Sequence, residues 1–172
     1  MILLSFDIEE FDMPLEYNGE SPWEEQLAGA RKGLQSILRT LKNNDVKATF
    51  FSTVVFAENN QDLVRQLLSE GHELASHTWF HSDFDEKHLL ESRLELEKLF
   101  DTTVKGLRMP RMSPVSDDAV SDAGYFYNSS INPTYLPGRY NNFNFSRKPF
   151  WQTKVLQFPP SVSTMSRIPV FC

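Results

Sequence analysis

The stretch "VKATFFSTVVFAENNQDLVRQLLSEGHELAS", residues 46–76, alternates between two hydrophobic periods. It begins with "VKATFFS" and ends with "HELAS", and both are short apolar runs typical of buried strands. Between them, "QDLVRQLLSE" repeats apolar residues at helical spacing and stops at Gly71. A strand, a helix and a strand in this order predict two parallel strands joined across a helix.

The same alternation extends in both directions along the chain. The further predicted strands are "ILLSFD" (2–7), "TVKGLR" (103–108), "YFYNSS" (125–130) and "KVLQFPPSV" (154–162), and the further predicted helices cover 21–44, 85–100 and 116–123. Residues 131–150 lack periodicity and predict a long ordered loop with aromatic anchors. The series indicates an α/β fold, with a parallel sheet or barrel covered by helices.

Composition limits the classes of protein to which the chain can belong. Its 172 residues, 40% of them hydrophobic, are enough for one domain with a real core, so we expect a single domain over 1–172. A net charge of -6 argues against a nucleic-acid groove and an anionic membrane surface. The single cysteine, Cys172, allows no disulfide within the chain. We see neither an export signal nor a membrane span, and therefore expect a cytoplasmic protein.

Ionisable side chains follow several of the predicted strands. Asp7 and Glu9 lie at the end of the first strand, His77 and His81 follow "HELAS", and Arg108 ends "TVKGLR". Because the carboxyl ends of parallel strands meet at one rim, these groups are expected to lie near one another. The alternatives without a catalytic role are that the carboxylates are solvated at the end of the strand and that the arginine forms an ion pair at the surface.

His77 and His81 indicate a metal site. Residues four apart on one helical turn can direct both imidazoles at one ion, and one added carboxylate completes the two-histidine, one-carboxylate set of an open catalytic zinc site. Asp7 and Glu9 share one side of a strand, so they can divide the roles of general base and metal ligand. With four histidines in the chain, the spacing of His77 and His81 could also arise by chance.

These motifs resemble those of the polysaccharide deacetylase family, the NodB-type carbohydrate esterases. "SFDIEEFD" is similar to the family's first motif, "SHTWFHS" to its His-(Ser/Thr)-x-x-His-(Ser/Thr) motif, "RMPR" to its Arg-x-Pro motif and "YNSS" to a later strand end. The resemblance implies a distorted (β/α) barrel with a divalent metal, usually zinc. It also implies Asp7 as the catalytic base, His77 and His81 as metal ligands, and Arg108 as the arginine that holds the base.

Two departures from the family pattern bear on the site. The family's second aspartate is replaced by Ile8, which makes the chain an Asp-x-Glu variant and suggests Glu9 as the third ligand. The family's last motif supplies a histidine as general acid, and no histidine follows His88. We therefore expect residues 1–172 to be a form truncated at the C-terminus, without the last barrel strands. Such an open barrel could associate with a second copy through its exposed sheet edges.

The resemblance predicts a hydrolase that removes an acetyl group from an acetylated amino sugar or glycan, with N-acetyl favoured over O-acetyl. Two alternatives stay open from the sequence. One is a non-catalytic carbohydrate-binding or scaffold protein, favoured by Ile8 and by the missing acid. The other is a hydrolase of small cyclic amides, similar to allantoinases or imidases, because such enzymes share the fold and a similar site.

Overall fold

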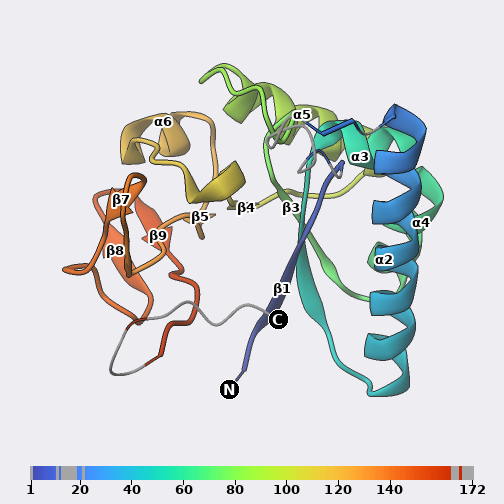
Figure 1. Ribbon diagram of the computed structural model, residues 1–172, viewed down its shortest axis with the longest axis horizontal. Coiled ribbons are helices and arrows are strands. Elements are labelled where there is room, and N and C mark those ends of the chain that lie inside the picture. The colour runs from blue at the N-terminus through green and yellow to red at the C-terminus, as the bar shows by residue number, and fades with distance from the viewer. Residues whose placement is uncertain (1, 11, 13–18, 21, 164–166, 168–172) are drawn as a thin grey trace. The chain divides into compact units, whose positions relative to one another are not determined.

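The computed structural model describes residues 2–10, 12, 19–20, 22–163 and 167. Cys172 lies outside this set. The chain divides into two compact units, Met1–Val104 and Lys105–Cys172, and each is described by itself. The first holds strands β1 (Leu4–Ile8), β2 (Ala48–Ser52) and β3 (Glu73–Ser76), with helices α2 (Trp23–Asn43), α3 (Val54–Asn59), α4 (Gln61–Ser69) and α5 (His88–Phe100) (Figure 1).

In the first unit, β1 pairs with β2 and β2 with β3, both in parallel. Ile8 of β1 aligns with Ser52 of β2, and Ser52 aligns with Ser76 of β3. All three strands therefore end at one level. The α/β class and the parallel pairing predicted from residues 46–76 are confirmed.

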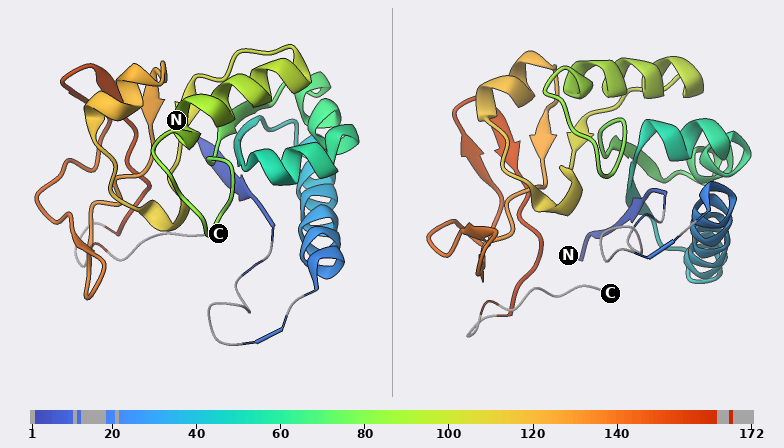
Figure 2. Two further views of the ribbon diagram at one scale, coloured as in Figure 1. Left: turned by 90° about the horizontal axis from the view of Figure 1, so that it is seen from above. Right: turned by 45° about the horizontal axis from the view of Figure 1, so that its top comes forward.

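The core of the first unit is formed by β2 and by the apolar faces of the helices. Phe50 and Phe51 of β2 are almost fully buried, as are Leu34 and Leu38 of α2. Burying each such side chain contributes about 1.5–3 kcal/mol. Helix α2 packs beside α4, and α3 packs against α4 and α5, as both views in Figure 2 show.

Helix α3 was not predicted. Its first four residues are all buried and only Glu58 and Asn59 at its end are exposed, so the six residues are too few to show a helical period. Thr53 begins the helix, because its side-chain oxygen accepts a hydrogen bond from the backbone N–H of Phe56 (3.2 Å). The helix therefore starts immediately after β2 ends.

The second unit contains short strands and one short helix. Its elements are β4 (Gly106–Leu107), the 3₁₀ helix η1 (Pro110–Met112), α6 (Asp117–Asp122), β5 (Tyr127–Asn128), β6 (Tyr135–Leu136), β7 (Tyr140–Asn141), β8 (Phe150–Gln152) and β9 (Val155–Gln157). Strands β4, β5 and β9 pair in parallel. The strands predicted over 103–108, 125–130 and 154–162 are present but shorter than expected.

Two features of the second unit correct the prediction of a continuous loop over residues 131–150. Strands β6 and β7 form an antiparallel pair within that segment. Strand β8 begins at Phe150 and runs antiparallel to β9. Both pairs are joined by short turns with positive φ angles, at Gly138 and at Thr153. Turn chemistry rather than hydrophobic period defines these hairpins, which is why the sequence pattern missed them.

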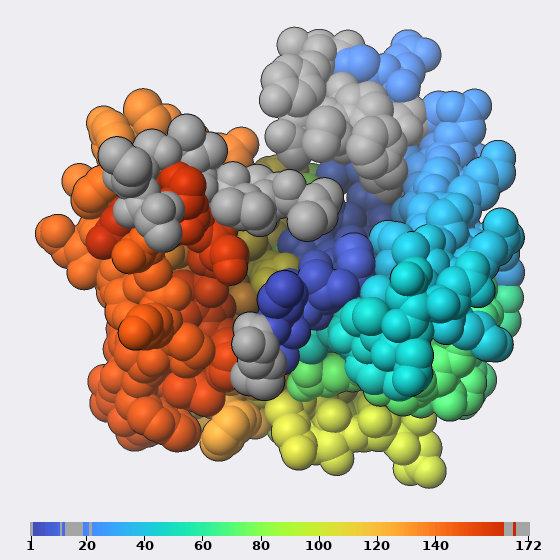
Figure 3. Space-filling view, turned by 90° about the horizontal axis from the view of Figure 1, so that it is seen from below, coloured from blue at the N-terminus to red at the C-terminus, as the bar shows by residue number. Residues whose placement is uncertain are grey.

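Strand β1 stands at the end of the strand order, with β2 as its partner. Seen from below, its dark-blue residues reach the surface beside the cyan turn between α2 and β2 (Figure 3). Association through this edge stays a prediction. None of the helices in the described part of the chain combines the length and the apolar character needed to cross a membrane.

Candidate metal centre

The common end of the three parallel strands positions the site. Glu9, Thr53 and His77 are the first residues after β1, β2 and β3, respectively. Backbone hydrogen bonds continue the ladder at this level, from Thr53 N–H to the Ile8 carbonyl (3.2 Å) and from His77 N–H to the Ser52 carbonyl (2.8 Å). The strand register thus brings residues that are far apart in the sequence to one edge of the sheet.

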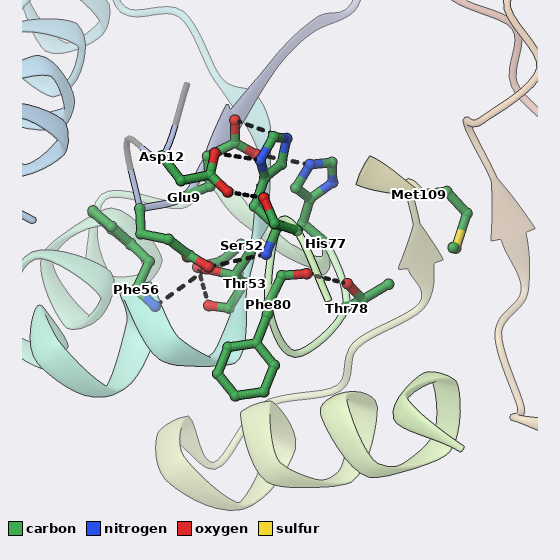
Figure 4. Close-up of polar contacts among 12 residues, drawn as sticks. Glu9, Asp12, Ser52, Thr53, Phe56, His77, Thr78, Phe80 and Met109 are labelled. Atoms are coloured by element: carbon green, nitrogen blue, oxygen red, sulfur yellow. Dashed lines mark hydrogen bonds and ion pairs between the residues drawn. The ribbon is translucent and has the colours of Figure 1, made fainter. Parts of the chain in front are cut away.

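Glu9, His77 and His81 form a cluster at this edge. Glu9 and His77 are labelled in Figure 4, where they lie next to one another. One carboxylate oxygen of Glu9, Oε2, lies 2.9 Å from Nε2 of His77, and the other, Oε1, lies 3.5 Å from Nε2 of His81. One potential ligand atom from each of the three residues lies within 4.8 Å of the others. The two imidazole rings are stacked, with centroids 6.0 Å apart. The sequence prediction that these three residues come together is confirmed.

The donor atoms of this cluster fit a divalent cation. Glu9 Oε2 is buried and accepts no hydrogen bond from the described residues, although Nε2 of His77 lies 2.9 Å from it. A cation bound at these atoms would pair with both the carboxylate oxygen and an unprotonated imidazole nitrogen. Two imidazole nitrogens and a carboxylate oxygen form one of the donor sets found in catalytic zinc sites. The cluster can therefore hold such an ion.

The two histidines do not lie on a helical turn, which corrects the local structure expected for them. They lie in an irregular segment between β3 and α5, and α5 begins only at His88. Between them, Thr78 adopts a left-handed backbone conformation (φ 67°), which is unusual for a β-branched residue. The two imidazole rings therefore face the same point because of this turn, and not because of helical geometry.

The start of α3 holds the segment that carries the histidines. The backbone N–H groups of Val54 and Val55 donate to the carbonyls of Thr78 (3.1 Å) and Trp79 (3.3 Å). These are N–H groups of the first helical turn, which have no acceptor within their own helix. The N–H groups at the start of the helix and the carbonyls of the histidine segment are therefore hydrogen-bonded to each other. These bonds hold the unusual backbone conformation of Thr78.

Two buried carboxylates next to the cluster were missed by the sequence reasoning. Glu10 accepts hydrogen bonds from the His81 backbone N–H (2.9 Å) and from the Thr53 hydroxyl (2.8 Å). Asp12 lies 2.7 Å from Nδ1 of His81 and accepts a hydrogen bond from the Ser82 hydroxyl. The only signal in the sequence was the density of acidic residues in "DIEEFD", a pattern that solvated strand ends also show.

The other two predicted site residues, Asp7 and Arg108, lie in different units. Asp7 is an exposed residue of β1, aligned with Phe51 of β2. Arg108 follows β4, is buried, and donates from Nη2 to the Ser129 hydroxyl (2.9 Å). That hydroxyl donates in turn to the Phe158 carbonyl (2.9 Å). The pairing of Arg108 with Asp7 stays a prediction.

The sequence profile described as "Polysaccharide deacetylase" matches residues 28–127, which is more than half of the chain. The chain belongs to the polysaccharide deacetylase family. The profile match includes the segment that carries both histidines. The carboxylate that faces them, Glu9, comes from the stretch that precedes the match.

Individual relatives of this deacetylase-family chain are similar over parts of their length. A 45-residue segment, 26% of the chain, is 47% identical to the peptidoglycan-N-acetylglucosamine deacetylase PgdA of Listeria monocytogenes, and it covers 10% of that protein. The chain spans between 10% and 38% of the length of the curated relatives that it matches.

Solved structures resemble the chain over nearly all of its length. A putative polysaccharide deacetylase from Mycobacterium smegmatis superposes with a TM-score of 0.71 at 20% identity, covering 92% of this chain and 58% of that one. The Puue allantoinase superposes with a TM-score of 0.70 at 21% identity, covering 93% and 61%, respectively. At these identities the likeness shows the fold, and the predicted fold class is confirmed.

Proposed function

We propose that the chain is the metal-binding part of a hydrolase that removes N-acetyl groups from amino sugars of a polysaccharide. The observation that carries this proposal is the convergence of Glu9, His77 and His81 at the end of three parallel strands. Membership of the polysaccharide deacetylase family supplies the reaction class. The support for N-acetylglucosamine as substrate comes from the activity for which the similar PgdA is named.

In this proposal Glu9, His77 and His81 hold a divalent cation, with zinc as the expected ion. Such an ion, when bound, lowers the pKa of a coordinated water to about 7 and polarises the acetyl carbonyl. The two imidazoles bind through Nε2, the nitrogen that faces Glu9 in each ring. His77 is 1% exposed, so its ring would be shielded from bulk water when it binds the ion.

Asp7 is proposed as the general base that takes the proton of the attacking water. It is exposed at the strand end two residues before Glu9, so a solvent molecule can reach its carboxylate. Arg108 is proposed to orient Asp7, through the favourable interaction of a carboxylate with a guanidinium. General base catalysis of this kind contributes about 100- to 10,000-fold in rate.

The test measures acetate released by the zinc-loaded chain from chitooligosaccharides, with O-acetylated xylan and allantoin as competing substrates. We expect acetate from the N-acetylated substrate and a fall of about 100-fold or more in Asp7→Asn. Asp83→Asn is the matched control, because Asp83 is an exposed carboxylate that follows the histidine pair and lies outside the cluster. Equal rates in Asp7→Asn and the control would remove Asp7 from the mechanism.

The two alternatives from the sequence give different outcomes in the same assay. Ring opening of allantoin without acetate release would replace the deacetylase proposal with a cyclic-amide hydrolase. Binding of chitooligosaccharide without turnover of any substrate would replace it with a carbohydrate-binding protein that has no catalytic activity.

A further inference from the structure

Asp12 and Glu10 are buried acids with no role in the proposed reaction. They are 7% and 5% exposed, respectively, and both contact His81. Carboxylates are almost never buried to this degree unless they are paired. Their burial therefore requires an explanation, and His81 is the partner that they share.

The contacts of Asp12 fix the proton arrangement of the His81 ring. The Asp12 carboxylate accepts from the Ser82 hydroxyl with Oδ2, and its Oδ1 lies 2.7 Å from Nδ1 of the ring. A carboxylate oxygen accepts hydrogen bonds, so this contact favours the form of the ring that carries its proton on Nδ1. In the neutral ring the lone pair then lies on Nε2, the nitrogen that faces Glu9 at 3.5 Å.

A lone pair on Nε2 facing a carboxylate oxygen is unfavourable without a positive charge between them. The same arrangement is what a bound cation requires, because neutral imidazole ligates through its unprotonated nitrogen. We propose that Asp12 is a positioning residue that holds His81 in the tautomer and orientation in which Nε2 is the ligand atom. This inference rests on the proposed function, since it concerns the same metal site.

Glu10 complements Asp12 by holding the backbone of the same residue. Its Oε1 accepts from the His81 N–H, and its Oε2 accepts from the Thr53 hydroxyl at the start of α3. The ring of His81 and its main chain are thus held by two acids from one short segment. The main chain of His77 is held differently, because its N–H belongs to the extended strand ladder.

The test uses the full chain, freed of metal with a chelator, and compares wild type with Asp12→Ala, Asp12→Asn and the control Asp83→Ala. The first readout is the nitrogen NMR spectrum of the histidine rings at about pH 8, above the ordinary histidine pKa of about 6.5. We expect His81 of the wild type to carry its proton on Nδ1, and to lose this preference in Asp12→Ala. Asparagine keeps an acceptor oxygen for Nδ1, so Asp12→Asn should retain the wild-type tautomer.

The second readout is the zinc dissociation constant, measured by competition with a chelating dye. Loss of a carboxylate that holds a ligating histidine typically weakens metal binding about 10- to 100-fold, and we expect Asp12→Ala to lie in this range. Asp12→Asn should lose less, and Asp83→Ala should bind like wild type. A protonated Nε2 in wild-type His81, or zinc binding by Asp12→Ala equal to that of wild type, would overturn the inference.

The two readouts separate this inference from the proposed function. If wild type binds no zinc while His81 shows the expected tautomer, the metal site of the proposed function fails and Asp12 only orders a histidine. If wild type and Asp12→Ala bind zinc equally, the metal site stands and the positioning role fails. Urea unfolding of each variant shows whether a lost affinity comes from a lost fold.

Discussion

Replacing Glu10 with alanine should destabilise the first unit strongly. The Glu10 carboxylate accepts two hydrogen bonds in a buried position, from the His81 N–H at 2.9 Å and from the Thr53 hydroxyl at 2.8 Å. Hydrogen bonds to a charged group each contribute about 1.5–3 kcal/mol, and their loss leaves two donors facing a cavity. We therefore expect Glu10→Ala to lower the free energy of unfolding by about 3–5 kcal/mol.

The assay is urea unfolding of the metal-free chain, followed by circular dichroism. With an m-value of about 2 kcal/mol per molar urea, the expected loss moves the midpoint down by about 1.5–2.5 M. Glu58→Ala is the matched control, since Glu58 is an exposed carboxylate on α3, and such a change should stay within about 0.5 kcal/mol. Glu10→Gln should fall between the two, because an amide keeps an acceptor for His81 and can donate to the hydroxyl. If Glu10→Ala unfolds at the same midpoint as Glu58→Ala, the network described around His81 does not stabilise the fold.

Three further predictions concern other parts of the chain. Burial lowers the pKa of His72, so the unfolded chain binds a proton more readily than the folded chain. The free energy of unfolding should therefore fall as pH drops below about 6.5, the ordinary pKa of histidine. Thermal unfolding at several pH values should show a smaller fall in His72→Gln. The hydrogen bond from Arg31 lowers the pKa of Asp62 to about 2, so the pair stabilises the fold above pH 3.8 and loses this effect as the pH falls toward 2. Because Asp62 is exposed, Asp62→Asn should lower the free energy of unfolding by no more than about 1 kcal/mol at pH 7. A larger loss in urea unfolding would contradict this. Gly106→Ala should lower the free energy of unfolding by about 1–3 kcal/mol in urea, because the added Cβ would clash with the ring of Tyr127. Unchanged stability would show that the ring can move away.

Hydrophobic period was enough to predict the order of most elements. The apolar stripe of α2 and the strands flanking α4 are encoded locally, so their positions follow from the sequence with errors of a few residues at the ends. Helix α3 was missed because Val54–Ala57 are buried on every side, and a short apolar helix then looks like the continuation of a strand.

The sequence predicted the proposed metal ligands but not the acids that contact them, because these acids lie far from His81 along the chain. The spacing of His77 and His81 and the likeness to a known motif indicated the ligands, although their convergence depends on the Thr78 backbone and not on a helical turn. Glu10 and Asp12 contact His81 across 71 and 69 residues of sequence, respectively. No local pattern distinguishes such buried acids from solvated ones, so only the folded chain reveals them.

We propose that Glu9, His77 and His81 hold one divalent cation. Calorimetric titration of the metal-free chain with zinc tests it most directly, with the variants Glu9→Ala and His77→Ala/His81→Ala measured beside wild type. We expect the wild type to bind one equivalent of zinc, Glu9→Ala to bind it more weakly, and the double variant to bind none at this site. A wild-type chain that binds no zinc, or a double variant that still binds one equivalent with unchanged affinity, would contradict it.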